Sequence, residues 1–409
     1  MKKDSKMKTL EEVCSFINGL WKGKKPPYVE VGVIRNKNFT KEGTLDFSDI
    51  AYLDVEQSQY AKRKLEFGDI ILEKSGGGPK QPVGRVVMFD KKDGEFSFSN
   101  FTSQIRVKNK EELDCYYLYR YLHYYYLTGL TENLQKHSTG IRNLQLKEYK
   151  QITIPIPPLS EQHRLVKMIE ETFEAIEQTI ENTKTNLQNS MELFESYVET
   201  VFSNPGENWE EKELGEVINI KHGFAFKSEF FSETGEYVLL TPGNFYEKGG
   251  YRDRGEKQKY YIGEIPENFI LAKGDILIAM TEQAAGLLGS PIIIPESNKF
   301  LHNQRLGLIL FKENFEISTK FLFYLFNTKR IRSLIHESAS GVKVRHTSPK
   351  KVMELKACFP PLTVQQSIAE KLETLAEETK KLEQIYAQKL ANLDELKRSI
   401  LQKAFNGEL

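Results

Sequence analysis

The sequence predicts a mixed α/β (α+β) protein in which one plan is used twice: a small globular domain followed by a long helix of a coiled-coil pair. Three observations lead to this fold class. Two stretches, 160–202 and 363–405, contain neither glycine nor proline. They align without a gap at a constant offset of 203 residues. The segments before them contain short apolar runs bounded by glycine and proline, the pattern of strands and turns.

Each long stretch begins with a helix start signal. Pro-Pro-Leu precedes both stretches, and proline cannot continue a helix from the N-terminal side. Ser160 and Thr363 then offer hydroxyl oxygens to the first unpaired backbone amides of the helix. At 1.5 Å per residue, each helix is expected to be about 65 Å long.

Apolar residues recur in both helices with a period close to 3.5, which is typical of a coiled-coil seam. A single helix cannot bury such a seam, so we expect the two helices to pack on each other. The alternative, two ordinary core helices, is disfavoured because unbroken helices of this length are unusual in globular domains. The seam residues predicted to be buried are Ile169, Ile176, Leu187, Leu372, Leu382 and Leu393.

The internal repeat extends into the globular segments. The stretch 10–20 resembles 214–224, and Gly-Asp-Ile at 68–70 returns at 274–276. A period of about half the chain indicates duplication with a pseudo-twofold axis, and not a solenoid. The predicted organisation is a first domain at 1–159, a first long helix at 160–204, a second domain at 205–362, and a second long helix with its tail at 363–409.

Inside each globular segment the pattern predicts short strands followed by one helix, as in a small α/β or α+β unit. The strands are expected at 28–34, 69–74, 85–89, 237–241, 275–280 and 290–294, and the helices at 111–126 and 318–336.

Composition points to a cytoplasmic protein that does not use a membrane. The sequence has no apolar run long enough to cross a bilayer, and its charged N-terminus does not resemble a secretory signal. Cys14, Cys115 and Cys358 are odd in number and far apart, so we expect reduced thiols and neither a disulfide framework nor a metal site.

The formal net charge is zero, but the charge is unevenly distributed along the chain. Residues 1–159 contain 26 Lys and Arg against 20 Asp and Glu, whereas residues 160–204 contain 3 against 9. A neutral total can therefore hide a basic first domain and an acidic first helix.

No catalytic signature stands out. The glycine run at 75–79 lacks the Gly-Lys-Ser/Thr that a phosphate-binding loop needs, so a flexible loop is the better interpretation. The Pro-Pro pairs lack the polar and aromatic neighbours of the amino-methyltransferase motif. The seven histidines show no metal-ligand spacing. We expect no catalysis, no metal and no bound cofactor in this chain.

The loops instead carry side chains that bond base edges and phosphate oxygens of DNA. For any single residue a solvated surface role is the simpler explanation, but matching loops of both halves contain such residues. The candidate DNA-binding residues are Arg35, Lys37, Asn38, Lys74, Lys80, Arg85, Arg142, Asn143, Asn244, Arg252, Arg254, Gln283, Asn303, Arg305, Lys343 and Arg345.

With these motifs in place, the chain resembles the specificity subunit (HsdS) of type I restriction-modification systems over essentially its whole length. The resemblance is carried by IPIPPLSEQ and CFPPLTVQQ at the helix starts, by GFAFKSEFF at 223–231, by the paired Gly-Asp-Ile strands and by the C-terminal LQKAFNGEL. Two positions depart from the family pattern. Val364 replaces an acidic residue, and residues 19–22 lack a clear Ala-Phe-Lys-Ser box, which leaves open the bases that each domain would read.

The resemblance implies two target recognition domains, each reading one half of a bipartite asymmetric site in double-stranded DNA. The long helices would pack antiparallel and set the unread spacer. Two methyltransferase (modification) subunits would dock on the chain, and restriction subunits would join them. S-adenosylmethionine, ATP and Mg would then be bound by these partners.

Two other classes stay open at this point. The chain could be a coiled-coil adaptor whose domains bind proteins, in which case association would not depend on salt as DNA binding does. It could also be a cryptic nuclease or methyltransferase, in which case the chain alone would cleave or methylate DNA.

Overall fold

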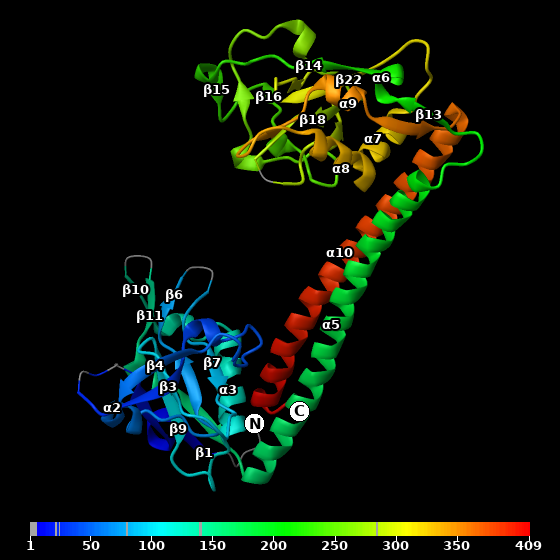
Figure 1. Ribbon diagram of the computed structural model, residues 1–409. Helices are drawn as coiled ribbons and strands as arrows, with labels where there is room; N and C mark the ends of the chain where they lie inside the picture. The colour runs from blue at the N-terminus through cyan, green and yellow to red at the C-terminus, as the bar shows by residue number, and fades with distance from the viewer. Residues whose placement is uncertain (1–5, 21–22, 24, 79–80, 139–140, 284) are drawn as a thin grey trace. The chain divides into compact units, whose positions relative to one another are not determined.

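The computed structural model describes residues 6–20, 23, 25–78, 81–138, 141–283 and 285–409 (Figure 1). The chain divides into two compact units. Unit 1 is Met1–Lys184 with Ala387–Leu409, and unit 2 is Thr185–Tyr386. Each unit therefore contains one globular domain and one half of each long helix.

Unit 1 contains mostly antiparallel strands and short helices. Its strands are β1 (Lys6–Thr9), β2 (Cys14–Asn18), β3 (Tyr28–Ile34), β4 (Ala51–Glu56), β5 (Ile70–Glu73), β6 (Ser75–Gly77), β7 (Val86–Met88), β8 (Phe96–Phe98), β9 (Thr102–Val107), β10 (Gln135–Ser138), β11 (Ile141–Leu144) and β12 (Thr153–Ile156). Its helices are α1 (Leu10–Val13), α2 (Gln57–Ala61), α3 (Cys115–Leu127) and α4 (Leu146–Tyr149), with 3-10 turns η1 (Asn36–Asn38) and η2 (Glu132–Leu134).

Unit 2 repeats most of this order. Its strands are β13 (Glu210–Glu213), β14 (Ile218–His222), β15 (Phe231–Ser232), β16 (Tyr237–Leu239), β17 (Tyr260–Tyr261), β18 (Ile276–Ala279), β19 (Thr281–Glu282), β20 (Pro291–Ile293), β21 (Phe300–Leu301), β22 (Leu306–Phe311), β23 (Arg345–His346) and β24 (Lys356–Phe359). Its helices are α6 (Leu214–Val217), α7 (Thr319–Asn327), α8 (Lys329–Ser338) and α9 (Pro349–Met353), with 3-10 turns η3 (Ser228–Phe230), η4 (Pro242–Asn244), η5 (Gly255–Lys257) and η6 (Glu267–Phe269).

The two long helices are α5 (Leu159–Ser203) and α10 (Leu362–Asn406). They begin at the residues that follow Pro-Pro, as the start signal predicts. The predicted fold class, mixed α/β with two repeated domains and two long helices, is confirmed.

The central four-stranded sheets of the two units correspond strand for strand. The order β2-β9-β5-β7 in unit 1 matches β14-β22-β18-β20 in unit 2, and all neighbours are antiparallel. Each unit also closes its domain with a two-stranded sheet, β1-β12 or β13-β24, whose last strand leads directly into a long helix. The internal repeat seen in the sequence is thus a repeat of topology.

The core of each unit joins the domain to the long helices. In unit 1, Tyr117 of α3 packs with Ile169 of α5 and with Leu401 and Phe405 of α10. In unit 2, Phe321 of α7 packs with residues of the same two helices, but at their other ends: Phe202 and Val198 of α5, and Ala369 and Leu372 of α10.

The early part of α5 therefore lies against the late part of α10 in unit 1, and the reverse holds in unit 2, so the helices run antiparallel within each unit (Figure 1). An ion pair of 3.2 Å between Lys397 Nζ and Glu177 Oε1 links the two helices in unit 1. Of the predicted seam residues, Ile169, Ile176 and Leu372 are buried, and Leu187 and Leu393 are half-buried.

The prediction for Leu382 is wrong, because this side chain is 39% exposed. The seam of α10 runs through Thr379, Glu383 and Tyr386, which are half-buried although two of them are polar or charged. Leu382 lies one residue beside this line, and one residue turns a helix by about 100°. A two-helix pair covers only a narrow face of each helix, so a neighbouring apolar residue stays in solvent.

The helix predicted at 318–336 is two helices, α7 and α8, which meet at Thr328. The Thr328 hydroxyl accepts a hydrogen bond from Ile331 N at 3.3 Å and so caps the new helix. A threonine can compete for backbone hydrogen bonds in this way, which is why a break was possible inside an otherwise apolar helical pattern.

Candidate nucleic-acid interface

Three segments of unit 1 that are distant in the sequence meet at one place: η1, β6 and β11. Asn36 Nδ2 donates a hydrogen bond of 2.7 Å to the carbonyl oxygen of Ser75, and the Ser75 hydroxyl contacts Asn143 Oδ1. Strand β11 pairs with β6 so that Arg142 lies opposite Gly77. The structure thus brings together loop residues that the sequence could only place on separate strands.

Arg85 was predicted to contact DNA, but its guanidinium is used inside the domain. Nε and Nη2 bind the Glu73 carboxylate at 2.7 and 2.9 Å, and Nη1 and Nη2 donate to the carbonyl oxygens of Phe39 and Asn36 at 3.2 Å. The Glu73 side chain is 3% exposed and a buried carboxylate requires a cation, so Arg85 serves as that cation and supports the η1 turn.

Asn38 and Asn244 were also predicted to contact DNA, and this is wrong as well, since they are only 2% and 1% exposed. They occupy the same place in η1 and η4. Asn38 Oδ1 accepts from Arg35 N at 2.9 Å, and Asn244 Oδ1 accepts from Thr241 N at 3.0 Å. Their amide groups also donate within the domain, Asn38 to the carbonyl oxygens of Asp46 and Asp49, and Asn244 to that of Arg252. Each asparagine therefore holds a loop in place.

The exposed neighbours of Asn38 stay available at the surface. The Arg35 and Lys37 side chains are 36% and 49% exposed, and both lie beside the Asp49 carboxylate. Lys74 donates a hydrogen bond of 2.8 Å to Asn18 Oδ1, and burial lowers the pKa of Lys74. Lys80 lies outside the described residues.

In unit 2 the corresponding strands are β19 and β23, which pair Glu282 with Arg345. The Arg345 guanidinium donates to the His336 carbonyl oxygen at 2.9 Å and contacts its ring nitrogen Nε2 at 2.8 Å. The Glu282 carboxylate accepts from the backbone amides of residues 286–288 at 2.9 to 3.1 Å. These contacts tie β23 to α8 and β19 to the turn at 286–288, so the Arg345 guanidinium, predicted to contact DNA, is engaged inside the domain.

The backbone pairing makes Arg142 equivalent to Arg345, again at the offset of 203. Leu144 N donates to the carbonyl oxygen of Lys74, and Thr347 N donates to that of Met280, so the two strand pairs share one register. In the sequence alone, the Gly-apolar-basic pattern makes Lys343, and not Arg345, the equivalent of Arg142.

The other candidates of unit 2 differ in accessibility. Asn303 is 8% exposed, and its Oδ1 accepts from Arg305 N at 3.0 Å, so Asn303 shapes the loop and does not reach out from it. Arg254 is half-buried, with its guanidinium against Gly243. The exposed candidates of this unit are Arg252, Gln283, Arg305 and Lys343.

Three exposed apolar residues beside these loops were not predicted. Tyr246 is 52% exposed with the Arg252 guanidinium 6.0 Å from its ring centroid, and Phe101 is 49% exposed next to Gly76. Val342 is fully exposed, between Gly341 and Lys343. The sequence feature that could have identified them is an apolar residue inside a polar loop, because such side chains can pack on base edges or stack on bases.

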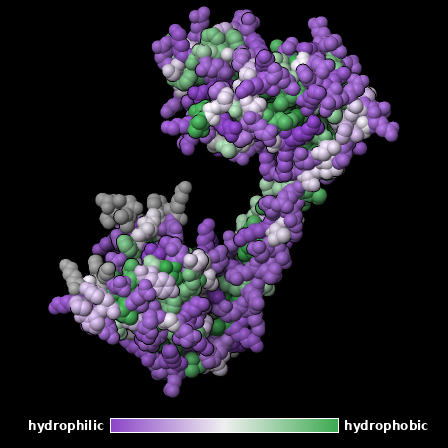
Figure 2. All heavy atoms as spheres, in the orientation of Figure 1, coloured by the Kyte–Doolittle hydropathy of each residue, from purple (hydrophilic) through white to green (hydrophobic). Residues whose placement is uncertain are grey.

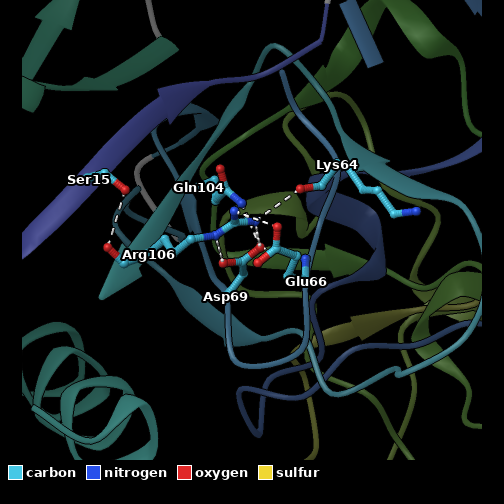
Figure 3. A network of polar contacts seen from close by, with 6 residues as sticks. All are labelled: Ser15, Lys64, Glu66, Asp69, Gln104 and Arg106. Carbon is cyan, nitrogen blue, oxygen red and sulfur yellow. Dashed lines mark hydrogen bonds and ion pairs between the residues drawn. The ribbon is translucent and has the colours of Figure 1, made fainter. Parts of the chain in front are cut away.

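In unit 1, a polar network fixes the turn before β5 (Figure 3). Arg106 binds Asp69 through Nε and Nη2, both at 2.7 Å, and its Nη1 binds Glu66 at 2.8 Å. Gln104 Nε2 donates to Asp69 Oδ2 at 2.6 Å. The contact that the two Gly-Asp-Ile motifs share is a turn closed by the aspartate: Asp69 Oδ2 accepts from Glu66 N at 2.7 Å, and Asp275 Oδ2 accepts from Ala272 N at 2.8 Å.

The visible surface is mostly hydrophilic, and apolar residues reach it along the long helices (Figure 2). The large apolar side chains exposed on these helices are Leu193, Tyr197, Val364, Leu382, Ile385 and Leu396. No group of three or more His, Cys, Asp or Glu in the described part of the chain is arranged to hold a metal ion. None of the helices in the described ranges combines the length and apolar character that crossing a membrane requires.

Comparisons with known proteins agree with this architecture. A family model described as the type I restriction modification DNA specificity domain matches residues 2–187 and 206–390. The chain is 24% identical to the type I restriction enzyme MjaVIII specificity subunit of Methanocaldococcus jannaschii over 70% of each chain. It is 25% identical to the StySPI specificity subunit of Salmonella potsdam over 92% of this chain and 82% of the relative.

Solved structures share the fold. A structure from a study of the complex assembly and conformational transition of the type I R-M system matches with a TM-score of 0.78 and 18% identity, over 100% of this chain and 99% of the other. The HsdS subunit from Thermoanaerobacter tengcongensis matches with a TM-score of 0.63 and 18% identity, over 100% and 98%.

Proposed function

The chain belongs to the family of type I restriction-modification DNA specificity proteins, and from this premise we infer that it is the DNA sequence-recognition subunit of a type I restriction-modification complex. The observation that carries this proposal is the repeat itself. Two units that share a central sheet topology each match the specificity model. The chain supplies recognition and no catalysis.

Residues 1–159 and 205–362 act as two target recognition domains, each reading one half of a bipartite site. The support is the matched η1 and η4 loops, whose buried asparagines are the same while their exposed residues differ. Two domains that recognise different half-sites need the same loop framework with different exposed side chains. The residues proposed to reach DNA are Arg35, Lys37, Lys74, Arg142, Asn143, Arg252, Arg254, Gln283, Arg305 and Lys343.

The paired helices, 160–204 and 363–409, set the spacer between the half-sites and carry the modification subunits. Their exposed apolar side chains support docking, because isolated leucines and isoleucines on a charged helix offer contact area to a protein partner. Two methyltransferase subunits bind there, restriction subunits join them, and the assembled enzyme works in the cytoplasm.

A domain exchange tests the proposal directly. Residues 205–359 are replaced by the equivalent segment of a relative, and the chain is expressed with its methyltransferase in a host without other adenine methylation. Long-read sequencing then maps the methylated adenines. We expect one half of the bipartite motif to change and the other half to persist. Loss or change of both halves together, or a wild-type motif that is not bipartite, would refute the proposal.

A further inference from the structure

Gln162, in the first turn of α5, is fully buried and joins the helix to the domain that precedes it. Its Oε1 accepts a hydrogen bond of 2.8 Å from Asp114 N. Its Nε2 donates to the carbonyl oxygens of Glu112 at 2.9 Å and Pro157 at 2.8 Å. One amide therefore connects the helix, the strand end that leads into it, and the start of α3.

Gln365 makes the same three contacts in unit 2 and is also 0% exposed. Its Oε1 accepts from Ser318 N at 2.9 Å, and its Nε2 donates to the carbonyl oxygens of Glu316 at 3.3 Å and Pro360 at 2.9 Å. Asp114 and Ser318 are the N-cap residues of α3 and α7. The joint is thus built identically twice, while the sequences around it have diverged.

Three backbone groups of each joint depend on the glutamine. An amide has two N–H donors and one carbonyl acceptor, and all three are used in each unit. An apolar residue of the same size would leave one backbone N–H and two carbonyl oxygens without these partners, and unpaired buried groups are strongly unfavourable. If the joint opened, these groups would regain hydrogen bonds to water. Opening would also change the angle between the domain and the helix.

Each joint also contains an ion pair between the domain and its long helix. This ion pair differs between the two units, whereas the glutamine contacts are the same. In unit 1, Arg120 of α3 binds Glu170 of α5 through two bonds of 2.7 Å. In unit 2, Lys320 of α7 binds Glu373 of α10 at 2.6 Å, on the solvent side. The ion pairs differ in residue type and exposure, whereas the buried amide keeps its three bonds.

We propose that Gln162 and Gln365 are positioning residues that hold each recognition domain at a fixed angle on its long helix and so keep the enzyme from accepting sites with a wrong spacer. This inference rests on the proposed function. Neither glutamine touches DNA in this scheme: the half-site sequences are read by the loops, and the glutamines control how far apart the half-sites must be.

The test compares Gln162→Met and Gln365→Met with the wild type in the full complex with its methyltransferase. Methylation rates are measured on duplexes whose spacer is the normal length, one base pair shorter or one longer. We expect the preference for the normal spacer to fall by about tenfold, the effect of losing one ordinary net hydrogen bond. The half-site sequences are expected to stay unchanged.

Ile169→Val is the matched control, because Ile169 is an apolar residue buried about two turns further along the same helix. It should lower the melting temperature while keeping the spacer preference. If Gln162→Met keeps the wild-type preference, or if Ile169→Val relaxes it equally, the glutamines only stabilise the fold and the proposal is wrong.

A measurement within unit 1 separates this inference from the proposed function. Spin labels are placed at Asp54→Cys on β4 and Glu174→Cys on α5, both exposed, with Cys115 and Cys358 replaced by serine. Gln162→Met should broaden the distance distribution between the two labels, and Ile169→Val should not. If Gln162→Met broadens the distribution but the wild type methylates no bipartite motif, the proposed function is wrong, and the role of Gln162 in fixing the domain on the helix still holds. An unbroadened distribution would reject the joint.

Discussion

Among single residues, the buried asparagines of η1 and η4 show how a loop is kept in shape for recognition. Asn38→Ala and Asn244→Ala should each lower the free energy of unfolding by about 1–3 kcal/mol, because backbone groups that they satisfy lose their partner in a buried place. Urea denaturation of the purified chain measures this. Lys37→Ala, at the exposed neighbouring position, should stay within about 0.5 kcal/mol of the wild type. A large loss for Lys37→Ala, or none for the asparagines, would contradict the assignment.

Arg142 and Lys343 are expected to contact phosphate, since both follow a Gly-apolar pair in the corresponding loops of the two units. Arg142→Ala and Lys343→Ala should weaken the binding of the complex to all DNA sequences and reduce the salt slope by about one unit each. Arg345→Ala is the informative comparison. Its guanidinium is engaged with His336, so this variant should lower thermal stability and leave the salt slope near the wild-type value. Unchanged salt slopes for Arg142→Ala and Lys343→Ala would leave these two residues a structural role only.

Two buried histidines make stability depend on pH. Burial lowers the pKa of His123 to about 3 and that of His302 to about 4. In the unfolded chain a histidine takes up a proton near pH 6.5, whereas the folded state keeps both rings neutral. The unfolded state therefore binds more protons as the pH falls below 6.5, and the free energy of unfolding drops by about 1.4 kcal/mol per pH unit for each histidine.

Melting curves at pH 7.5 and pH 5 check this expectation. His123→Phe and His302→Gln should each reduce the loss between the two pH values, whatever they do to stability at pH 7.5. Ile169→Val is the control, because it removes a buried methyl group without changing any titratable group and should leave the pH dependence as it is. An equal effect of the control would show that the buried rings are not responsible.

Among the elements, the two long helices can be lengthened by whole heptads without disturbing their heptad register. One heptad inserted after Lys184 in α5 and another after Tyr386 in α10 keep both seams in phase and add about 10.5 Å to each helix. If the helices set the spacer, the preferred site should gain up to about three base pairs, at roughly 3.4 Å per base pair. Methylation mapping reads out the spacer and both half-sites together.

Insertions of two residues at the same points are the control. They turn the following seam by about 200° and expose it, so activity should fall instead of moving to a longer site. An in-phase variant that stays active on the original spacer would show that the helices do not determine the distance, and the adaptor interpretation of the helices would gain support.

For the whole molecule, charge suggests that recognition depends on assembly. The chain has a formal net charge of zero, and its first long helix is acidic. Phosphate repels such a surface, and neutralising phosphates is the main source of DNA affinity. We therefore expect little specific binding by the chain alone at moderate salt, and tight binding once the methyltransferase is added. Gel shifts with and without the partner test this, and nanomolar specific binding by the lone chain would contradict it.

The sequence by itself determined the features that depend on local chemistry and on repetition. The starts of α5 and α10 follow from the Pro-Pro pairs before them, although Ser160 and Thr363, predicted as caps, lie inside the helices, and the duplication follows from the aligned motifs. The strands around Gly-Asp-Ile follow from apolar runs bounded by turn residues. These signals act over a few residues, so no knowledge of the packed domain is needed to read them.

Only the tertiary structure decided which polar loop residues face solvent and which apolar helix residues face each other. Asn38 and Lys37 are neighbours in one loop, yet one is buried and the other exposed. Arg85 is used by a glutamate twelve residues away, and Gln162 by an amide forty-eight residues away. Leu382 misses the seam that Leu393 joins. Burial and hydrogen-bond partners arise from segments that are distant in the chain, and the free energy that selects them appears only when those segments pack together.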